Sequence, residues 1–256
     1  MGKLRVDGNA FDALFYGKSN SSEADARHDA GEQAKRVQAR IDGTGEPKES
    51  YDVPIREEIV HRIDDRNLIT RNRYGALVLN TEDLLFIDID KPKFGFFEAL
   101  LGKAKGTTKE QITRMVEARA AKSAYRHLSF RLYETNVGVR VIVQGMQASP
   151  VSKQVMTLMR DFNTDPLYAM LCEKQQCYRA RLTPKPSRIK CNTPRVIFPR
   201  SETEQRTHQE WVRTYEQLSQ SAAVCRHIKD IGRFRENRTI RYHDEQTRCA
   251  KNLPLA

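Results

Sequence analysis

LLFIDID, residues Leu84–Asp90, combines five apolar residues with two aspartates, Asp88 and Asp90. A short run this rich in apolar residues predicts a buried strand. Side chains alternate between the two faces of a strand, so Asp88 and Asp90 are expected to leave the same face. Two like charges held that close repel each other unless a cation or a proton lies between them. The function of this pair is therefore the first question that the sequence raises.

Two hairpins are predicted around this stretch. The apolar run 74–80 (YGALVLN) is separated from Leu84–Asp90 by three residues, and that spacing predicts a β-hairpin. Residues 129–135 (SFRLYET) and 137–145 (VGVRVIVQG) alternate around a turn at Asn136–Gly138, which predicts a second hairpin. Lys91-Pro92-Lys93 is expected to end the first of these strand pairs, because proline cannot donate to a ladder.

The remaining segments alternate between helix and strand patterns. Apolar spacing predicts helices at 109–128 with Thr108 as N-cap, at 151–162, at 167–174 and at 203–223. Strands are predicted at 177–184 (CYRARLTP), at 224–232 (VCRHIKDIG) and at 238–247 (RTIRYHDEQT). This order predicts an α+β fold, with a mainly antiparallel sheet and helices packed against one face.

Composition limits the class of protein. The 256 residues are 39% hydrophobic and 30% charged, and no run approaches the roughly 18 apolar residues of a membrane span. The N-terminus lacks the apolar core of a signal peptide, and five irregularly spaced cysteines fit a reducing cytoplasm. Residues 1–50 are predicted to be a polar, partly flexible arm with a loose helix at Glu23–Ile41, and 51–256 a single α+β domain.

The net charge of +11 favours a polyanionic partner, with nucleic acid first among the candidates. The charge is concentrated, because the stretch from Tyr178 to Arg200 inclusive contains seven basic residues and no acid. We predict phosphate contacts for the strand and loop residues Arg179, Arg181, Lys185 and Arg188. Tyr178 is placed to stack on a base. The alternative is a structural loop whose basic side chains pair with acids elsewhere in the chain.

The Asp88/Asp90 pair suits a hard divalent cation, Mg²⁺ or Mn²⁺, with Asp244 as a candidate third ligand. Alternatively, Lys91 neutralises the pair, and Asp244 caps the last strand. Arg140, on the second hairpin, is a candidate for the triphosphate of a nucleotide, or else a solvent-facing arginine of an edge strand. Cys172, Cys177 and Cys191 lack the spacing of a zinc site, so buried free thiols are expected.

The motif FIDID resembles the first motif of the archaeo-eukaryotic primase and primase-polymerase superfamily, whose members carry two aspartates on one strand of an RRM-like sheet. The hairpin ETNVGVRV stands where the family has its second motif, with Arg140 in place of a histidine, and Asp244 in RYHD stands for the third aspartate. The resemblance covers 74–143 and one tail strand. It implies metal-dependent nucleotidyl transfer in DNA replication, with Asp88, Asp90 and Asp244 as catalytic metal ligands.

Three classes of function therefore stay open. The first is a nucleotidyltransferase that takes nucleoside triphosphates, or a metal-dependent nuclease with the same ion chemistry. The second is a non-catalytic nucleic-acid-binding accessory protein of replication or of a mobile element. The third is an enzyme that acts on small phosphorylated molecules. The sequence contains no P-loop, GxGxxG, GxSxG or HExxH motif, which argues against the common motor, dehydrogenase and hydrolase families.

Overall fold

The structure is a computed structural model. It describes residues 2–6, 9–15, 17, 22–44, 57–90, 107–146, 148–149, 151–196 and 198–256. The chain divides into two compact units, Met1–Ile55 and Arg56–Ala256.

The first unit contains a two-stranded antiparallel hairpin and one helix. Strands β1 (Gly2–Val6) and β2 (Asn9–Ala13) pair, and helix α1 spans Glu23–Ile41 with Ser22 as its N-cap. The predicted helix of the polar arm is therefore confirmed, whereas the hairpin had no counterpart in the prediction. α1 has no buried residue, and two hydrogen bonds between Gln38 and the backbone of Arg5, of 2.7 and 3.0 Å, join it to β1.

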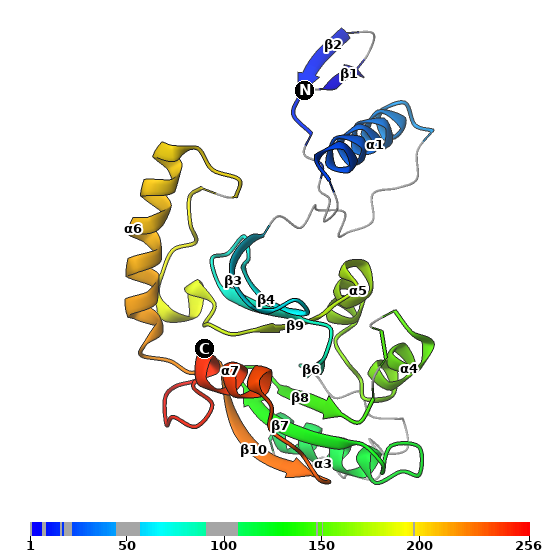
Figure 1. The fold of residues 1–256 in the computed structure, drawn as a ribbon, viewed down its shortest axis with the longest axis vertical. Helices are drawn as coiled ribbons and strands as arrows, with labels where there is room; N and C mark the ends of the chain where they lie inside the picture. The colour runs from blue at the N-terminus through cyan, green and yellow to red at the C-terminus, as the bar shows by residue number, and fades with distance from the viewer. Residues whose placement is uncertain are drawn as a thin grey trace. The chain divides into compact units, whose positions relative to one another are not determined.

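The second unit contains two four-stranded sheets (Figure 1). One has the order β3-β4-β5-β9, with β3 (Glu58–Asp64), β4 (Asn67–Arg71), β5 (Leu77–Thr81) and β9 (Tyr178–Arg181). The other has the order β10-β7-β8-β6, with β6 (Leu85–Ile89), β7 (Ser129–Thr135), β8 (Val139–Gln144) and β10 (Cys225–Ile231). Every pairing between these strands is antiparallel, which agrees with the predicted α+β class.

The predicted hairpin between 74–80 and Leu84–Asp90 is wrong. β5 pairs with β4 and β9, whereas β6 pairs with β8, so the chain passes from one sheet to the other within three residues. Thr81 makes this step possible, because its buried hydroxyl accepts hydrogen bonds from the backbone amides of Asp83 and Leu84. The second predicted hairpin is confirmed as β7 and β8. Lys91-Pro92-Lys93 lies outside the described residues.

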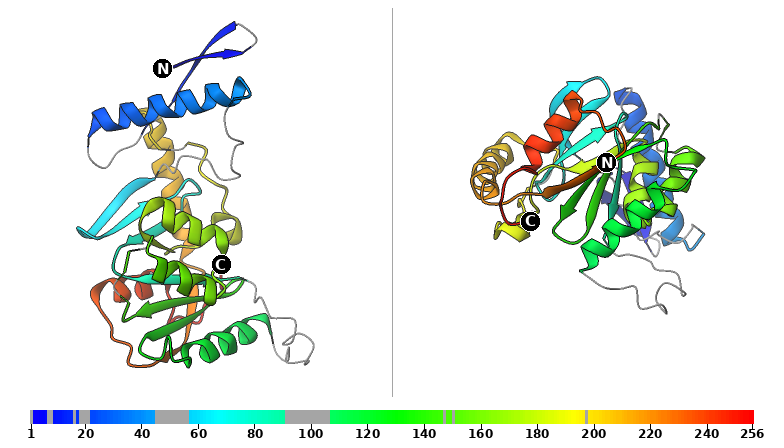
Figure 2. Two further views of the ribbon diagram at one scale, coloured as in Figure 1. Left: turned by 90° about the vertical axis from the view of Figure 1, so that its right-hand side faces the viewer. Right: turned by 90° about the horizontal axis from the view of Figure 1, so that it is seen from below.

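Helices cover both faces of the β10-β7-β8-β6 sheet, which corrects the predicted one-sided packing (Figures 1 and 2). α3 (Thr108–Ala120) and α4 (Lys153–Asp161) bury Ile112, Val116, Val155 and Leu158 on one face. There Phe130 of β7 stacks on Phe162, with ring centroids 5.4 Å apart. On the other face lies α7 (Arg238–Thr247), a helix where a strand was predicted.

The other helices occur close to where apolar spacing placed them. α5 spans Pro166–Gln175 with Asp165 as N-cap, and α6 spans Glu202–Ser219 with a capping box of Ser201 and Glu204. The N-cap of α3 is Thr107 rather than Thr108. The Thr107 hydroxyl accepts a hydrogen bond from the backbone amide of Glu110, and the Glu110 carboxylate accepts one from the backbone amide of Thr107. A 3₁₀ helix, η1 (Pro186–Ile189), follows β9.

Candidate functional site

Asp88 lies in a row of polar side chains that crosses three strands. In the antiparallel register, Asp88 of β6 is opposite Arg140 of β8, and Arg140 is opposite Tyr133 of β7. These side chains leave the sheet face that α7 covers, because His243 of α7 contacts both Arg140 and the ring of Tyr133. The row therefore lies between the sheet and α7.

The Arg140 guanidinium neutralises Asp88. Its Nε donates to Asp88 Oδ1 at 2.9 Å and its Nη2 to Oδ2 at 3.4 Å, while its Nη1 donates to the Arg181 carbonyl at 2.9 Å. The Arg140 side chain is 4% exposed and that of Asp88 28%. Burial lowers the pKa of Arg140, but the Asp88 carboxylate more than offsets this, so the net pKa of Arg140 is raised. Arg140 thus holds Asp88 and is not free to take a phosphate.

His243 extends the row to Asp244. The Nη1 of Arg140 is 3.4 Å from His243 Nε2, and Asp244 Oδ1 is 2.8 Å from His243 Nδ1. A guanidinium can only donate, so Nε2 is the acceptor and Nδ1–H donates to Asp244. Burial lowers the pKa of His243, which agrees with this neutral tautomer.

Asp244 is committed to partners within the fold. It accepts from the Tyr133 hydroxyl at 2.6 Å and pairs with Arg131 at 3.2 Å. Burial alone would raise the pKa of Asp244, but the hydrogen bonds from His243 and Tyr133 bring it below its ordinary value. Among the described residues, no three His, Cys, Asp or Glu side chains are arranged to hold a metal ion. The expected Asp88, Asp90 and Asp244 cluster is therefore not formed.

Asp90 differs from Asp88 in lacking a partner. It follows β6 directly, is exposed, and makes no ion pair or side-chain hydrogen bond with the rest of the described chain. Partial burial of its carboxyl group and the negative charge of Asp88 raise its pKa, and the charges of Lys185 and Arg188 oppose that rise. The predicted repulsion within the acid pair is thus present. Arg140 relieves it at Asp88 only, and Lys91 lies outside the described residues.

A basic cluster borders the acid pair. Its members are Arg181 at the end of β9, Lys185 before η1 and Arg188 within η1, and we call them the basic loop. None of the three forms an ion pair with an acid of the described chain. Burial and repulsion from Arg140 and Arg188 lower the pKa of Arg181 to about 10. Burial also lowers the pKa of Lys185 and of Arg188, and the nearby charge of Asp90 opposes this shift only in part.

Helix α6 holds the basic loop in place. The Tyr215 hydroxyl is hydrogen-bonded to the Pro184 carbonyl at 2.6 Å and to the Thr183 hydroxyl at 2.7 Å. Tyr215 stacks on Trp211, with centroids 4.9 Å apart, and Trp211 stacks on His208 at 5.7 Å. The outer side of Trp211 packs on Gly75, where a Cβ would lie 2.0 Å from the indole. Through these contacts α6 joins the basic loop to the turn at Gly75, which is distant from the loop in sequence.

Arg179 is a structural residue, in contrast to the predicted phosphate contact. Its guanidinium donates to both carboxylate oxygens of Glu57, at 2.7 and 2.6 Å, and to Gln175 at 2.6 Å. The side chain is 11% exposed. Tyr178 is buried, with its hydroxyl donating to the Ala148 carbonyl, so it is not available to stack on a base. The alternative that basic residues of this stretch pair with acids is therefore correct for Arg179.

The cysteines are free thiols. Cys172 and Cys191 are buried and Cys177 is partly buried, and burial raises the pKa of each thiol. In the part of the chain that the structure describes, they belong to no metal-binding group.

Sequence reasoning missed Tyr133 and His243. Tyr133 was a residue of a predicted strand with no assigned role, and His243 was placed on a strand. Asn237 could have indicated a helix at 238–247, because asparagine is a typical helix N-cap residue. In the structure its side chain accepts a hydrogen bond from the backbone amide of Ile240 at 2.8 Å.

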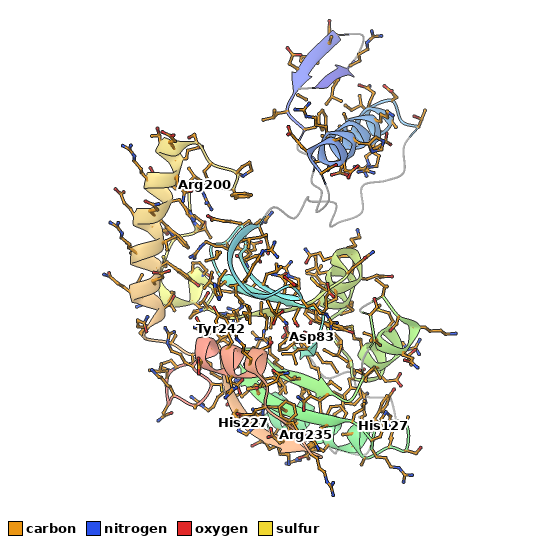
Figure 3. The ribbon with its side chains drawn as sticks, viewed as in Figure 1. Asp83, His127, Arg200, His227, Arg235 and Tyr242 are labelled. Carbon is orange, nitrogen blue, oxygen red and sulfur yellow. The ribbon has the colours of Figure 1, made fainter. Side chains whose placement is uncertain are left out.

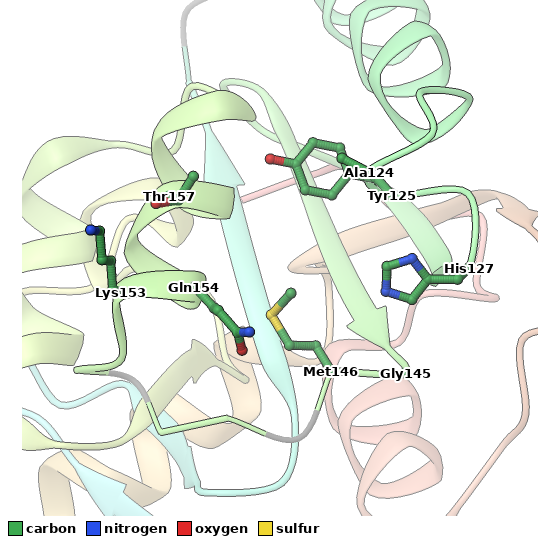
Figure 4. A pocket seen from close by; sticks show the side chains of 8 residues that line it. All are labelled: Ala124, Tyr125, His127, Gly145, Met146, Lys153, Gln154 and Thr157. Carbon is green, nitrogen blue, oxygen red and sulfur yellow. The ribbon is translucent and has the colours of Figure 1, made fainter.

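A hollow of about 570 Å³ lies elsewhere, between the turn after α3, the end of β8 and the start of α4 (Figure 4). Tyr125, His127, Met146 and Lys153 are among the residues that line it, and none of the predicted site residues does. The candidate site therefore does not coincide with this hollow.

The sequence matches no protein-family model, and no curated protein and no solved structure matches it. In the described part of the chain, no helix is both long enough and apolar enough to cross a membrane.

Proposed function

We propose that this protein binds nucleic acid, with the basic loop against the phosphates. One observation carries the proposal: Arg181, Lys185 and Arg188 lie together and form no ion pair in the described chain, and the nearby charges of Asp88 and Asp90 offset their burial only in part. Phosphate oxygens would supply the missing negative charge through charge-assisted hydrogen bonds. The net charge of +11 favours the same partner.

The proposal is tested with Lys185→Gln/Arg188→Gln and a control of equal charge change, Arg206→Gln/Arg213→Gln on the exposed side of α6. Anisotropy of labelled DNA and RNA oligonucleotides, single-stranded and duplex, is measured across a salt series. For duplex, each lost phosphate contact reduces the slope of log K against log salt by about 0.9, so we expect a change of about 1.8 for the loop variant alone. Absence of binding by the wild type at low salt, or equal losses in both variants, would contradict the proposal.

A second candidate, metal-dependent nucleotidyl transfer of the primase type, is favoured by Asp90. Its carboxylate has no partner in the described chain, and its pKa is raised by partial burial and by Asp88. Two carboxylates fit Mg²⁺ or Mn²⁺ when phosphates and water supply the other ligands. Asp88 fits less well, because Arg140 already contacts both of its oxygens. A bound ion would neutralise charge on the phosphates, and the basic loop would orient them.

Asp90→Asn is the informative variant for this candidate, because it leaves the Asp88–Arg140 pair intact. Asp65→Asn, at an exposed turn, is the control. Primer extension or strand cleavage with Mg²⁺ or Mn²⁺ is expected to fall at least tenfold in Asp90→Asn alone. If the variant keeps the wild-type rate, or if no metal-dependent turnover occurs while binding is intact, the enzyme candidate fails and the binding proposal stands.

A further inference from the structure

A second group of arginines lies on α7 and on the segment that precedes it. Arg233 and Arg235 belong to the segment between β10 and α7, and Arg238 and Arg241 to the first turn of α7. All four are exposed, and none forms an ion pair within the described chain. We call these four residues the arginine surface. Figure 3 labels Arg235 on this segment.

The nearby acids are used by a different residue, Arg131. Its guanidinium pairs with Asp230 at 2.8 Å, Glu236 at 3.0 Å and Asp244 at 3.2 Å. The Arg131 side chain is 11% exposed, so these carboxylates are drawn to a mostly buried cation. Glu236 is the only acid from 231 to 243, and its carboxylate pairs with Arg131 and with none of the four arginines. The four exposed guanidinium groups therefore form no ion pair in the described chain and are open to an external anion.

The segment that carries these arginines has a defined conformation. The backbone amide of Arg235 donates to Gln144 Oε1 at 2.9 Å, and its carbonyl accepts from Gln144 Nε2 at 2.6 Å. The Phe234 ring lies over the Arg131 guanidinium, 4.4 Å from its centroid. The backbone of the segment is therefore already held in place when a ligand contacts it, so little backbone entropy is lost on binding.

Helix α7 adds to the positive potential. Its N-terminal turn contains Arg238 and Arg241 and no acid, although the helix dipole there favours negative charge. The dipole and the two side chains have the same sign, so an external anion gains from both. Directly after Arg241, partly buried Tyr242 stacks on exposed His61 of β3, with centroids 6.2 Å apart. Arginines beside aromatic rings are typical of nucleic-acid surfaces.

We propose that the arginine surface is a second contact for the phosphodiester backbone of nucleic acid, separate from the basic loop. The inference rests on the proposed nucleic-acid binding and enlarges its footprint. It assigns to the protein two sets of phosphate contacts, one beside Asp90 and one on α7 and the segment before it. Four guanidinium groups supply planar, bidentate donors for consecutive phosphates.

The test compares two variants that lose the same charge. The first carries arginine-to-glutamine substitutions at 233, 235, 238 and 241. The control carries them at four exposed arginines that are scattered over the same unit, Arg126, Arg160, Arg206 and Arg213. Duplex binding is measured by anisotropy between about 50 and 200 mM salt. We expect the first variant to lose at least tenfold in affinity and about 3.6 in the magnitude of the salt slope, and the control to change both far less.

The two proposals fail in different ways. If the wild type and Lys185→Gln/Arg188→Gln differ in binding but the arginine-surface variant matches its control, the second contact is refuted and the proposed function stands. If the wild type binds phosphatidylserine vesicles but no oligonucleotide, both are refuted. Urea unfolding checks that each variant is folded, and cooperative transitions with midpoints close to that of wild type are expected because the substituted side chains are on the surface.

Discussion

Asp88→Asn is expected to destabilise the protein, because it removes the charge that balances Arg140. Removing one member of a buried ion pair costs about 3–5 kcal/mol. Here the Arg140 side chain is 4% exposed but that of Asp88 is 28% exposed, and an asparagine oxygen can still accept from Nε. The Arg181 carbonyl also keeps its bond to Nη1. We therefore expect a loss of about 2–3 kcal/mol in the free energy of unfolding.

The assay is urea unfolding of the full chain at neutral pH, followed by far-UV circular dichroism. With a slope of about 2–3 kcal/mol/M, the loss corresponds to a midpoint lower by about 1 M. Glu82→Gln is the control, because its pair with Arg66 has side chains 56% and 59% exposed and is worth at most about 1 kcal/mol. If Asp88→Asn unfolds at the same urea concentration as this control, the pairing argument is refuted. If Asp88→Asn is destabilised as expected, a loss of activity in this variant does not by itself identify Asp88 as a metal ligand.

Three further variants test other parts of the fold. Asp90→Asn is expected to be more stable than wild type at neutral pH, and urea midpoints should converge as the pH falls, because the raised pKa of Asp90 favours its protonated form in the folded state. Lower stability at neutral pH would contradict this. Gly75→Ala should lower the free energy of unfolding by about 2–4 kcal/mol, since the φ of Gly75 is +93° and the new Cβ would lie 2.0 Å from Trp211. Gly31→Ala is the control, because a Cβ at Gly31 meets open space, and it should increase the helicity measured by circular dichroism. A Gly75→Ala protein as stable as wild type would refute the close approach. Burial lowers the pKa of His208 from 6.5 to about 4, so the unfolded state takes up the proton first and wild-type stability is expected to decrease as the pH falls from 6.5 to 4. His208→Phe should reduce this decrease, and identical pH profiles of stability for the two proteins would refute the role of His208.

Local patterns predicted the elements that local interactions decide. The turn at Asn136–Gly138 defines the β7–β8 hairpin, and Asp165 before Pro166 defines the start of α5. The pattern failed at 238–247, where Thr239, Ile240, His243 and Thr247 are buried at helical spacing but were read as an alternating strand. In a ten-residue stretch that fits both the helix period and the strand period, packing on the sheet determines which of the two forms, and the local sequence does not specify that packing.

The sequence predicted several residues of the site but not which of them form pairs. Asp88 and Arg140 were both candidates, but their cross-strand register, which makes them an ion pair, depends on β6 joining β8 and not β5. The position of Asp244 on a helix, and the pairing of Arg179 with Glu57, depend on segments more than 100 residues apart. Such long-range contacts leave no trace in local spacing.

The stack of Trp211 on Tyr215 gives the protein an internal optical probe. The chain has a single tryptophan, so its fluorescence arises from one known place. That indole also donates to the Asn192 carbonyl at 2.7 Å, and its neighbour Tyr215 holds Pro184 at the start of the basic loop. A change in the loop is therefore transmitted to the surroundings of the emitting ring within two contacts. Emission wavelength and lifetime consequently report on the basic loop without any added label.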